Sequence, residues 1–239
     1  MQLGAVLGLL STKVLGQFVL PLSAIGGGHL VVVGPNLLVL ADQHGELAAD
    51  IRRTILLHEV THRLQFDGVD WLGAHLRSLV AAYLEDARVD VSRLAGALDE
   101  LPSVVARVRD EASLLPLVEM ILTPAQRAVL DQAQGLMSLL EGHGTAAMYS
   151  ATVGVVHDPD GVRAALSSRP PDVASKVLTA VAGLEMKKRQ YRIGEAFVQE
   201  VVDAHGTAGL NRAFDSPDRL PTHAEIEHPN AWTQRVGLG

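Results

Sequence analysis

Apolar side chains recur every three to four residues through most of the chain, which is the period of amphipathic α-helices. The pattern predicts helices over residues 47–66, 71–98, 123–140, 173–184 and 185–204. One face of the first helix carries Ile51, Ile55, His58, His62 and Phe66. Its two histidines continue an otherwise apolar stripe, so we expect them to face the interior.

Local signals support the ends of these helices. Asp50 lies in the first turn of the helix over 47–66, where a negative charge suits the helix dipole. Thr123 followed by Pro124 is typical of a helix start, with threonine as the cap and proline in the first turn. Gly142 and Gly144 predict a bend after residue 140.

The remaining pattern predicts little β-structure. Residues 3–19 are expected to be helical despite three glycines, and the apolar runs 30–33 and 37–40 are expected to form one or two short strands. Beyond residue 211 we expect turns and short helices. No domain boundary is evident, so the prediction is one mainly α domain over residues 1–239, with a minor β element near residues 30–40.

Composition narrows the possible functions. The 239 residues are 48% hydrophobic. They contain no cysteine, which excludes disulfides and thiolate chemistry. Their net charge of −7 argues against nucleic-acid binding. No uninterrupted apolar run reaches the 18 residues that suggest a membrane span. The apolar N-terminus contains Lys13 and has no basic leader or clean cleavage site, so we expect a cytoplasmic protein rather than a secreted one.

Residues 58–62 read His-Glu-Val-Thr-His, the H-E-x-x-H pattern of zinc-binding helices in metalloproteases. Residues four apart lie one above the other on a helix, so His58 and His62 can reach one ion. Glu59 can lean toward a water on that ion, whose pKa zinc lowers to about 7. The alternative is two core histidines that are satisfied by backbone carbonyls.

A catalytic zinc site needs a third protein ligand. The extended pattern with a third histidine is absent, because Gln65 and Gly68 occupy the positions of its glycine and histidine. A carboxylate is therefore expected. Glu85 lies in a charged stretch typical of a solvated surface, whereas Glu141 continues an apolar helical face, as a buried group with a partner would. We prefer Glu141.

Several stretches together resemble a zincin-like family of zinc-dependent metalloproteases, also described as hydrolases associated with deazaflavin-coenzyme biosynthesis. They are residues 14–18, 34–37, 58–66 and 138–144, then Gln190, Tyr191, Gly194 and Phe197, and finally residues 220–226. The resemblance implies one largely helical domain whose zinc is held by the H-E-x-x-H helix and a downstream acidic residue. Two departures from the family are expected: Thr145 and Tyr149 stand where it usually has acidic residues, and an N-terminal segment that its relatives tend to carry would be absent.

Other polar residues have competing interpretations. His143 could stabilise the oxyanion of a tetrahedral intermediate, orient Glu141 or do neither. Tyr191 could play the oxyanion role but sits on an apolar face typical of the core. His223 and His228, beside Glu225 and Glu227, could form a second metal site, although display on the surface is the simpler interpretation. The ligands we predict for zinc remain His58, His62 and Glu141.

The predicted reaction is metal-assisted hydrolysis of a peptide or a small amide. Glu59 would take a proton from the attacking water and return it to the leaving amine, with His143 as a second catalytic candidate. Two other functions stay open: a non-catalytic interaction protein stabilised by zinc, and an amide hydrolase acting on a small metabolite.

Overall fold

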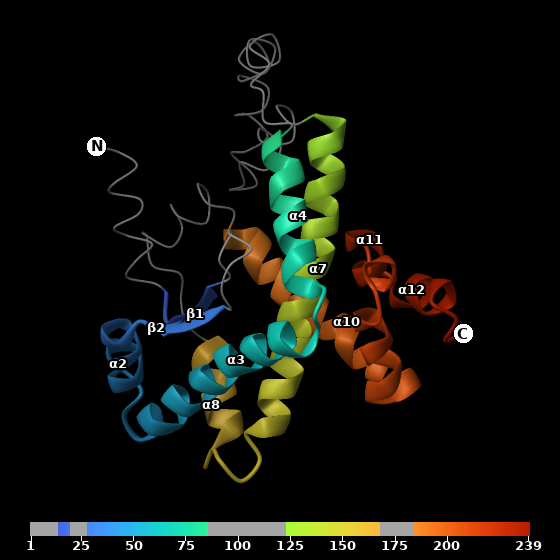
Figure 1. Cartoon of the computed structure of the whole chain (residues 1–239). Helices are drawn as coiled ribbons and strands as arrows, with labels where there is room; N and C mark the ends of the chain where they lie inside the picture. The colour runs from blue at the N-terminus through green and yellow to red at the C-terminus, as the bar shows by residue number, and fades with distance from the viewer. Residues whose placement is uncertain (1–13, 20–27, 86–122, 168–183) are drawn as a thin grey trace, which may run out of the picture.

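The fold was determined as a computed structural model, which describes residues 14–19, 28–85, 123–167 and 184–239. Figure 1 shows these segments in colour, with helix α7 running through the centre and crossed by α3 and α10. The described part is almost entirely helical, so the expected mainly α fold is confirmed. The predicted helical segments 3–13, 86–98 and 173–183 lie outside the described residues.

The chain begins with two short strands and continues through helices. Its elements are β1 (Gly16–Val19), β2 (His29–Val32), α2 (Gly34–Asp42), η1 (Gly45–Leu47), α3 (Ala48–Gly68), α4 (Leu72–Glu85), α7 (Pro124–Ala151), α8 (Pro159–Ser167), α10 (Leu184–Asn211), η2 (Arg212–Phe214), η3 (Pro217–Arg219), α11 (His223–Glu227) and α12 (Pro229–Arg235). The short elements after residue 211 agree with the prediction of turns and short helices there.

The two strands form one antiparallel pair in which Gly16 lies opposite Val32 and Val19 opposite His29. The strand predicted over 30–33 is therefore present, but its partner is the stretch 16–19, which we expected to be helical. The strand predicted over 37–40 is also wrong, because these residues belong to α2. Pro35 lies in the first turn of α2, where proline favours a helix start.

Helix α3 confirms the helix predicted over residues 47–66, although it begins one residue later and ends two residues later. Ile51 and Ile55 are buried, as the stripe required. They pack with Leu37, Leu40 and Val162, so α3 is held between α2 and α8. The segment before α2 is tied down as well, because the amide of Asn36 donates a hydrogen bond of 2.7 Å to the carbonyl oxygen of Val14.

Helix α7 begins at the predicted cap. The hydroxyl of Thr123 accepts a hydrogen bond from the backbone N–H of Gln126, and the Gln126 side chain accepts one from the backbone N–H of Thr123. The predicted bend at Gly142 and Gly144 is wrong, since α7 continues unbroken to Ala151. These glycines instead permit close contacts between helices.

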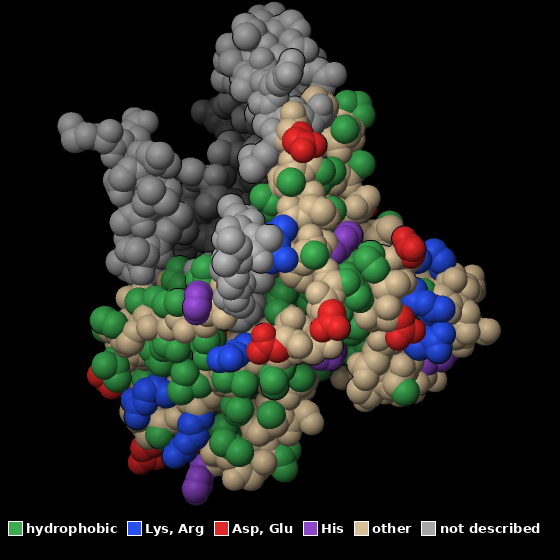
Figure 2. Space-filling model, viewed as in Figure 1, with side chains coloured by type: hydrophobic (Ala, Val, Ile, Leu, Met, Phe, Trp, Pro, Cys, Tyr) green, Lys and Arg blue, Asp and Glu red, His purple; other side chains and the backbone are tan. Residues whose placement is uncertain are grey.

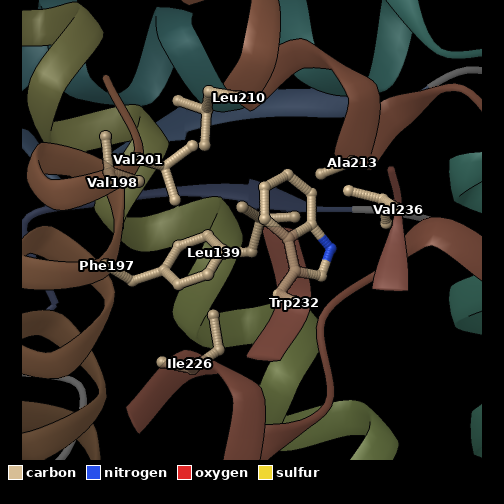
Figure 3. Close-up of a cluster of buried hydrophobic side chains, with 9 residues drawn as sticks. All are labelled: Leu139, Phe197, Val198, Val201, Leu210, Ala213, Ile226, Trp232 and Val236. Atoms are coloured by element: carbon tan, nitrogen blue, oxygen red, sulfur yellow. The ribbon is translucent and has the colours of Figure 1, made fainter. Parts of the chain in front are cut away.

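The main core lies where α7 meets α10 and the C-terminal helices. Figure 3 shows its nine buried side chains, with Leu139 of α7 and Trp232 of α12 near its centre. The rings of Phe197 and Trp232 meet edge to face at 5.3 Å between centroids. The indole N–H of Trp232 donates a hydrogen bond of 2.8 Å to the carbonyl oxygen of Arg219. A second cluster, Leu72, Leu79, Leu136 and Leu140, joins α4 to α7.

The outer face of α3 is apolar. Leu56, Val60 and Leu64 are spaced four residues apart and so lie on one face of the helix. All three are exposed, and Leu64 has 64% of its surface accessible to solvent. Leu38 and Val39 of α2 are exposed as well. Figure 2 shows many hydrophobic side chains on the part of the surface formed by α2 and α3. Within the described residues, no helix combines the length and apolar character that crossing a bilayer requires.

Gly142 lets α7 and α10 approach each other closely. A methyl group at Gly142 would overlap the carbonyl oxygen of Gly194, and one at Gly194 would overlap that of Ser138. The backbones of the two helices are therefore in direct contact immediately after Glu141.

We expect Gly142→Ala to lower the free energy of unfolding by about 1–3 kcal/mol or more, because the added methyl group forces α7 and α10 apart. Urea unfolding followed by circular dichroism measures the change. Gly68→Ala is the matched control: it is also helical, has no atom within 4 Å of the added carbon, and should change stability by less than about 1 kcal/mol. Equal midpoints for Gly142→Ala and the wild type would contradict the close contact.

Asp50 fastens the start of α3 to the turn that leads into α8. Its carboxylate accepts hydrogen bonds from the backbone N–H groups of His157 at 2.9 Å and Asp158 at 3.1 Å, and from Arg53 at 2.8 Å. Burial raises the pKa of Asp50, but the hydrogen bonds from Asp158 and His157 and the nearby guanidinium of Arg53 together bring it below its usual 3.8.

A lowered pKa means that Asp50 contributes stability above its unfolded pKa and loses that contribution as pH falls through its folded pKa. We therefore expect Asp50→Asn to have a lower urea midpoint than the wild type at pH 7, with chelator present. The difference should begin to shrink once the pH drops below about 3.9. A difference that is the same at pH 7 and pH 3 would show that the ionised carboxylate is not responsible.

Candidate metal centre

Helix α3 presents His58 and His62 one turn apart, as their spacing predicts. Their Nε2 atoms lie 3.1 Å from each other, and their rings meet nearly at right angles with centroids 4.5 Å apart. The two side chains are 16% and 13% exposed, so solvent can reach them. The closeness of the two Nε2 atoms to each other favours a shared ion over the alternative of two separate core histidines.

The third group comes from α7. Oε2 of Glu141 lies 3.4 Å from Nε2 of His58 and 3.3 Å from Nε2 of His62. Room for the His62 ring is provided by Gly144, where an added methyl group would lie 3.1 Å from its Cε1 atom. Glu141 and Gly144 lie in one unbroken helix. The position of the Glu141 backbone is therefore fixed relative to Gly144, against which the ring of His62 packs.

The spacing of these three atoms fits a divalent ion. Donor atoms about 2.05 Å from a tetrahedral zinc ion are about 3.3 Å from one another. The three observed separations lie between 3.1 and 3.4 Å. Two imidazoles and a carboxylate are also the donor types that zinc accepts. Among the residues that the structure describes, this is the group of His, Asp and Glu side chains that could hold a metal ion.

The charges around the histidines favour a cation between them. Burial lowers the pKa of His62, but the hydrogen bond and charge of Glu141, then Gln65 and the charge of Glu59, raise it above its usual 6.5. Burial lowers the pKa of His143, and the nearby His62 lowers it further. The carboxylates of Glu141 and Glu59 therefore favour positive charge at His62.

Glu59 is buried, with 8% of its surface exposed, and lies under strand β1. A methyl group at Gly16 would be 2.6 Å from its Cγ and 2.9 Å from its Oε1. Only a residue without Cβ allows the strand to pass this close to the carboxylate. Strand β1 thus confines the side chain that the sequence assigns to proton transfer.

Gln65 is the site residue that the sequence analysis missed as a functional group. Its Oε1 lies 2.9 Å from Nδ1 of His62, and its Nε2 lies 2.9 Å from both the carbonyl oxygen of Leu140 and Nδ1 of His143. A polar residue three positions after His62 on a buried face was the available signal. His143 is consequently joined to the site through Gln65, and its ring packs against Phe214 at 5.2 Å.

Glu85 does not belong to this group and is exposed at the end of α4. Tyr191 is a residue of α10, and the prediction for its side chain lies outside the described part. Glu225 caps α11 with Thr222 and pairs with Arg235 at 2.6 Å, which accounts for its carboxylate without a metal.

At the two positions where the resemblance expected acidic residues, the structure has other contacts. Thr145 is half-buried one turn after Glu141. The ring of Tyr149 is covered by the guanidinium of Arg163, 3.8 Å from the ring centroid, and Arg163 also pairs with Glu195 at 3.7 Å.

Comparisons with known proteins agree with this geometry. The sequence profile described as zincin-like metallopeptidase matches residues 1–233, which include every residue of the candidate site. The crystal structure of a proposed hydrolase with a novel fold from Chloroflexus aurantiacus is 30% identical and has a TM-score of 0.69. That similarity covers 99% of this chain and 67% of the other. No curated protein matches the chain.

Proposed function

The chain belongs to the zincin-like metallopeptidase family, and from that premise we propose that it is a zinc-dependent hydrolase that cleaves peptides. The observation that carries the proposal is the convergence of His58, His62 and Glu141 beside the buried carboxylate of Glu59. The similarity to a proposed hydrolase supports the same reaction class.

His58, His62 and Glu141 would hold the zinc ion. When bound, zinc supplies Lewis acidity that polarises the scissile carbonyl and makes a water molecule acidic near neutral pH. Catalytic zinc sites use three protein ligands and structural sites use four. Among the residues that the structure describes, three donors meet here, on histidines that solvent reaches, which favours catalysis over the alternative of a zinc-stabilised interaction protein.

Glu59 is the proposed general base. Three observations support this role: Glu59 follows His58 on α3, its charge acts on His62, and β1 lies against its side chain. It would accept the proton of the attacking water and donate it to the leaving amine. His143 remains a candidate donor to the developing oxyanion, because Gln65 contacts its Nδ1 and no hydrogen bond from a described residue occupies its Nε2.

The proposed chemistry is compatible with two classes of substrate, peptides and small amides. A peptide fits the family description, whereas an amide of a small metabolite would be the alternative within the same chemistry. Digestion of a peptide library with and without chelator distinguishes them: chelator-sensitive cleavage supports the peptidase, and intact peptides together with turnover of small amides support the alternative.

We expect purified protein to bind one zinc ion, and His58→Ala and Glu141→Ala to lose it, because each removes one of three donors. Metal content after dialysis against zinc measures this. Glu85→Ala is the control, since Glu85 is exposed at the end of α4. Stoichiometric zinc in Glu141→Ala, with loss in Glu85→Ala, would transfer the ligand role to Glu85.

We expect Glu59→Gln to keep its zinc while turnover falls by about 10²–10⁴-fold, because glutamine fills the same space but cannot accept the proton. Initial rates on a cleaved library peptide, normalised to zinc content, measure the loss. Glu46→Gln removes an exposed carboxylate just before α3 and should leave the rate unchanged. Unchanged turnover in Glu59→Gln at equal zinc content would remove Glu59 from the mechanism.

A further inference from the structure

The side chain of Gln65 is buried, with 5% of its surface exposed, and it bridges α3 and α7. It makes three polar contacts, each 2.9 Å long. They join Oε1 to Nδ1 of His62, and Nε2 to the carbonyl oxygen of Leu140 and to Nδ1 of His143. One primary amide therefore touches both histidines, one on each helix.

The backbone of α7 determines which way this amide points. The carbonyl oxygen of Leu140 can only accept a hydrogen bond, so the group of Gln65 that faces it must be the amino group. The reversed orientation would place two oxygen atoms 2.9 Å apart in a buried position with no hydrogen between them, which is strongly unfavourable. The position of Nε2 is thus independent of the protonation of either histidine.

This orientation has opposite consequences for the two imidazoles. The amide oxygen faces Nδ1 of His62 and cannot donate, so Nδ1 must carry a proton, and in the neutral ring Nε2 keeps a lone pair on the side of Glu141. The second N–H of the amino group faces Nδ1 of His143. That nitrogen must accept, so the proton of a neutral His143 resides on Nε2.

We propose that Gln65 is a positioning residue that fixes the tautomers of His62 and His143, with the proton on Nδ1 of His62 and on Nε2 of His143. The carbonyl oxygen of Leu140 fixes the orientation of the Gln65 amide. The part that concerns metal binding rests on the proposed function. The part that concerns His143 rests only on the hydrogen bonds. Because Leu140 directly precedes Glu141, the same contact also sets the distance between His62 and the carboxylate.

Long-range ¹H–¹⁵N spectra of the imidazoles test the tautomers directly, because they distinguish protonated from unprotonated ring nitrogens. We expect zinc-loaded protein to show the proton of His62 on Nδ1, and protein with or without zinc to show that of His143 on Nε2. The ten histidines are assigned by single substitutions. A wild-type His143 with its proton on Nδ1 would overturn the proposal.

Two substitutions separate the functions of the amide. Gln65→Leu removes all three contacts, and we expect zinc affinity, measured by competition with a chelator, to fall by about 10–100-fold. Gln65→Glu keeps an acceptor for His62 but loses the hydrogen bond to the carbonyl oxygen of Leu140 and turns an oxygen toward it, so we expect it to recover only part of the zinc affinity that Gln65→Leu loses. As a carboxylate its second oxygen can only accept, so we expect the proton of His143 to move to Nδ1.

Gln126→Leu is the matched control. Gln126 is also a buried glutamine, 7% exposed, but it serves the cap at the other end of α7. We expect this variant to lose stability and to retain the wild-type zinc affinity and tautomers.

Gln65→Leu with wild-type zinc affinity would overturn the role of Gln65 toward the metal. A wild-type protein that binds no zinc would instead refute the proposed function, while the spectrum of His143 would still decide the orientation of Gln65. The two failures are therefore distinguishable.

Discussion

The site depends on the close approach of α7 to a helix on each of two opposite faces. Gly142 and Gly144 are two residues apart, about 200° around a helix, so they face away from each other. Gly142 meets the backbone of α10, and Gly144 leaves room for the ring of His62 on α3. Glu141 lies beside both contacts. Its carboxylate is placed by backbone packing on either side of α7, which a flexible glutamate on a surface helix would lack.

This placement has an electrostatic cost that the site itself offsets. A buried carboxylate beside two imidazoles and a second buried carboxylate would be strongly destabilised without compensating positive charge. In the protein alone, Glu141 raises the pKa of His62 and so favours a proton there. A divalent ion offers more positive charge at the same point. The three donor atoms already have a spacing that suits such an ion, so its binding would require little reorganisation.

The sequence predicted what depends on contacts within one helix. The spacing of His58 and His62, the extent of α3 and the cap at Thr123 all follow from residues three or four apart. Predictions failed where an element depends on distant partners. Residues 37–40 have the pattern of a strand but belong to α2, which begins just before Pro35. Residues 16–19 form a strand paired with β2, although we expected a helix there. Gly142 and Gly144 were interpreted as a bend because sequence cannot show which helices pass close to them.

The same distinction explains why Glu141 could be predicted and Gln65 could not. Glu141 is a chemically specific residue, so the need for a third ligand directs attention to it over a separation of 79 positions. A glutamine carries no charge and binds no zinc, and its importance arises only from the carbonyl oxygen and the two imidazoles that the fold brings to it. Three fixed partners leave its amide one orientation, and that orientation specifies where two protons must be. In a site of this kind, a residue that sets the tautomers of neighbouring imidazoles need not be one that can itself be protonated.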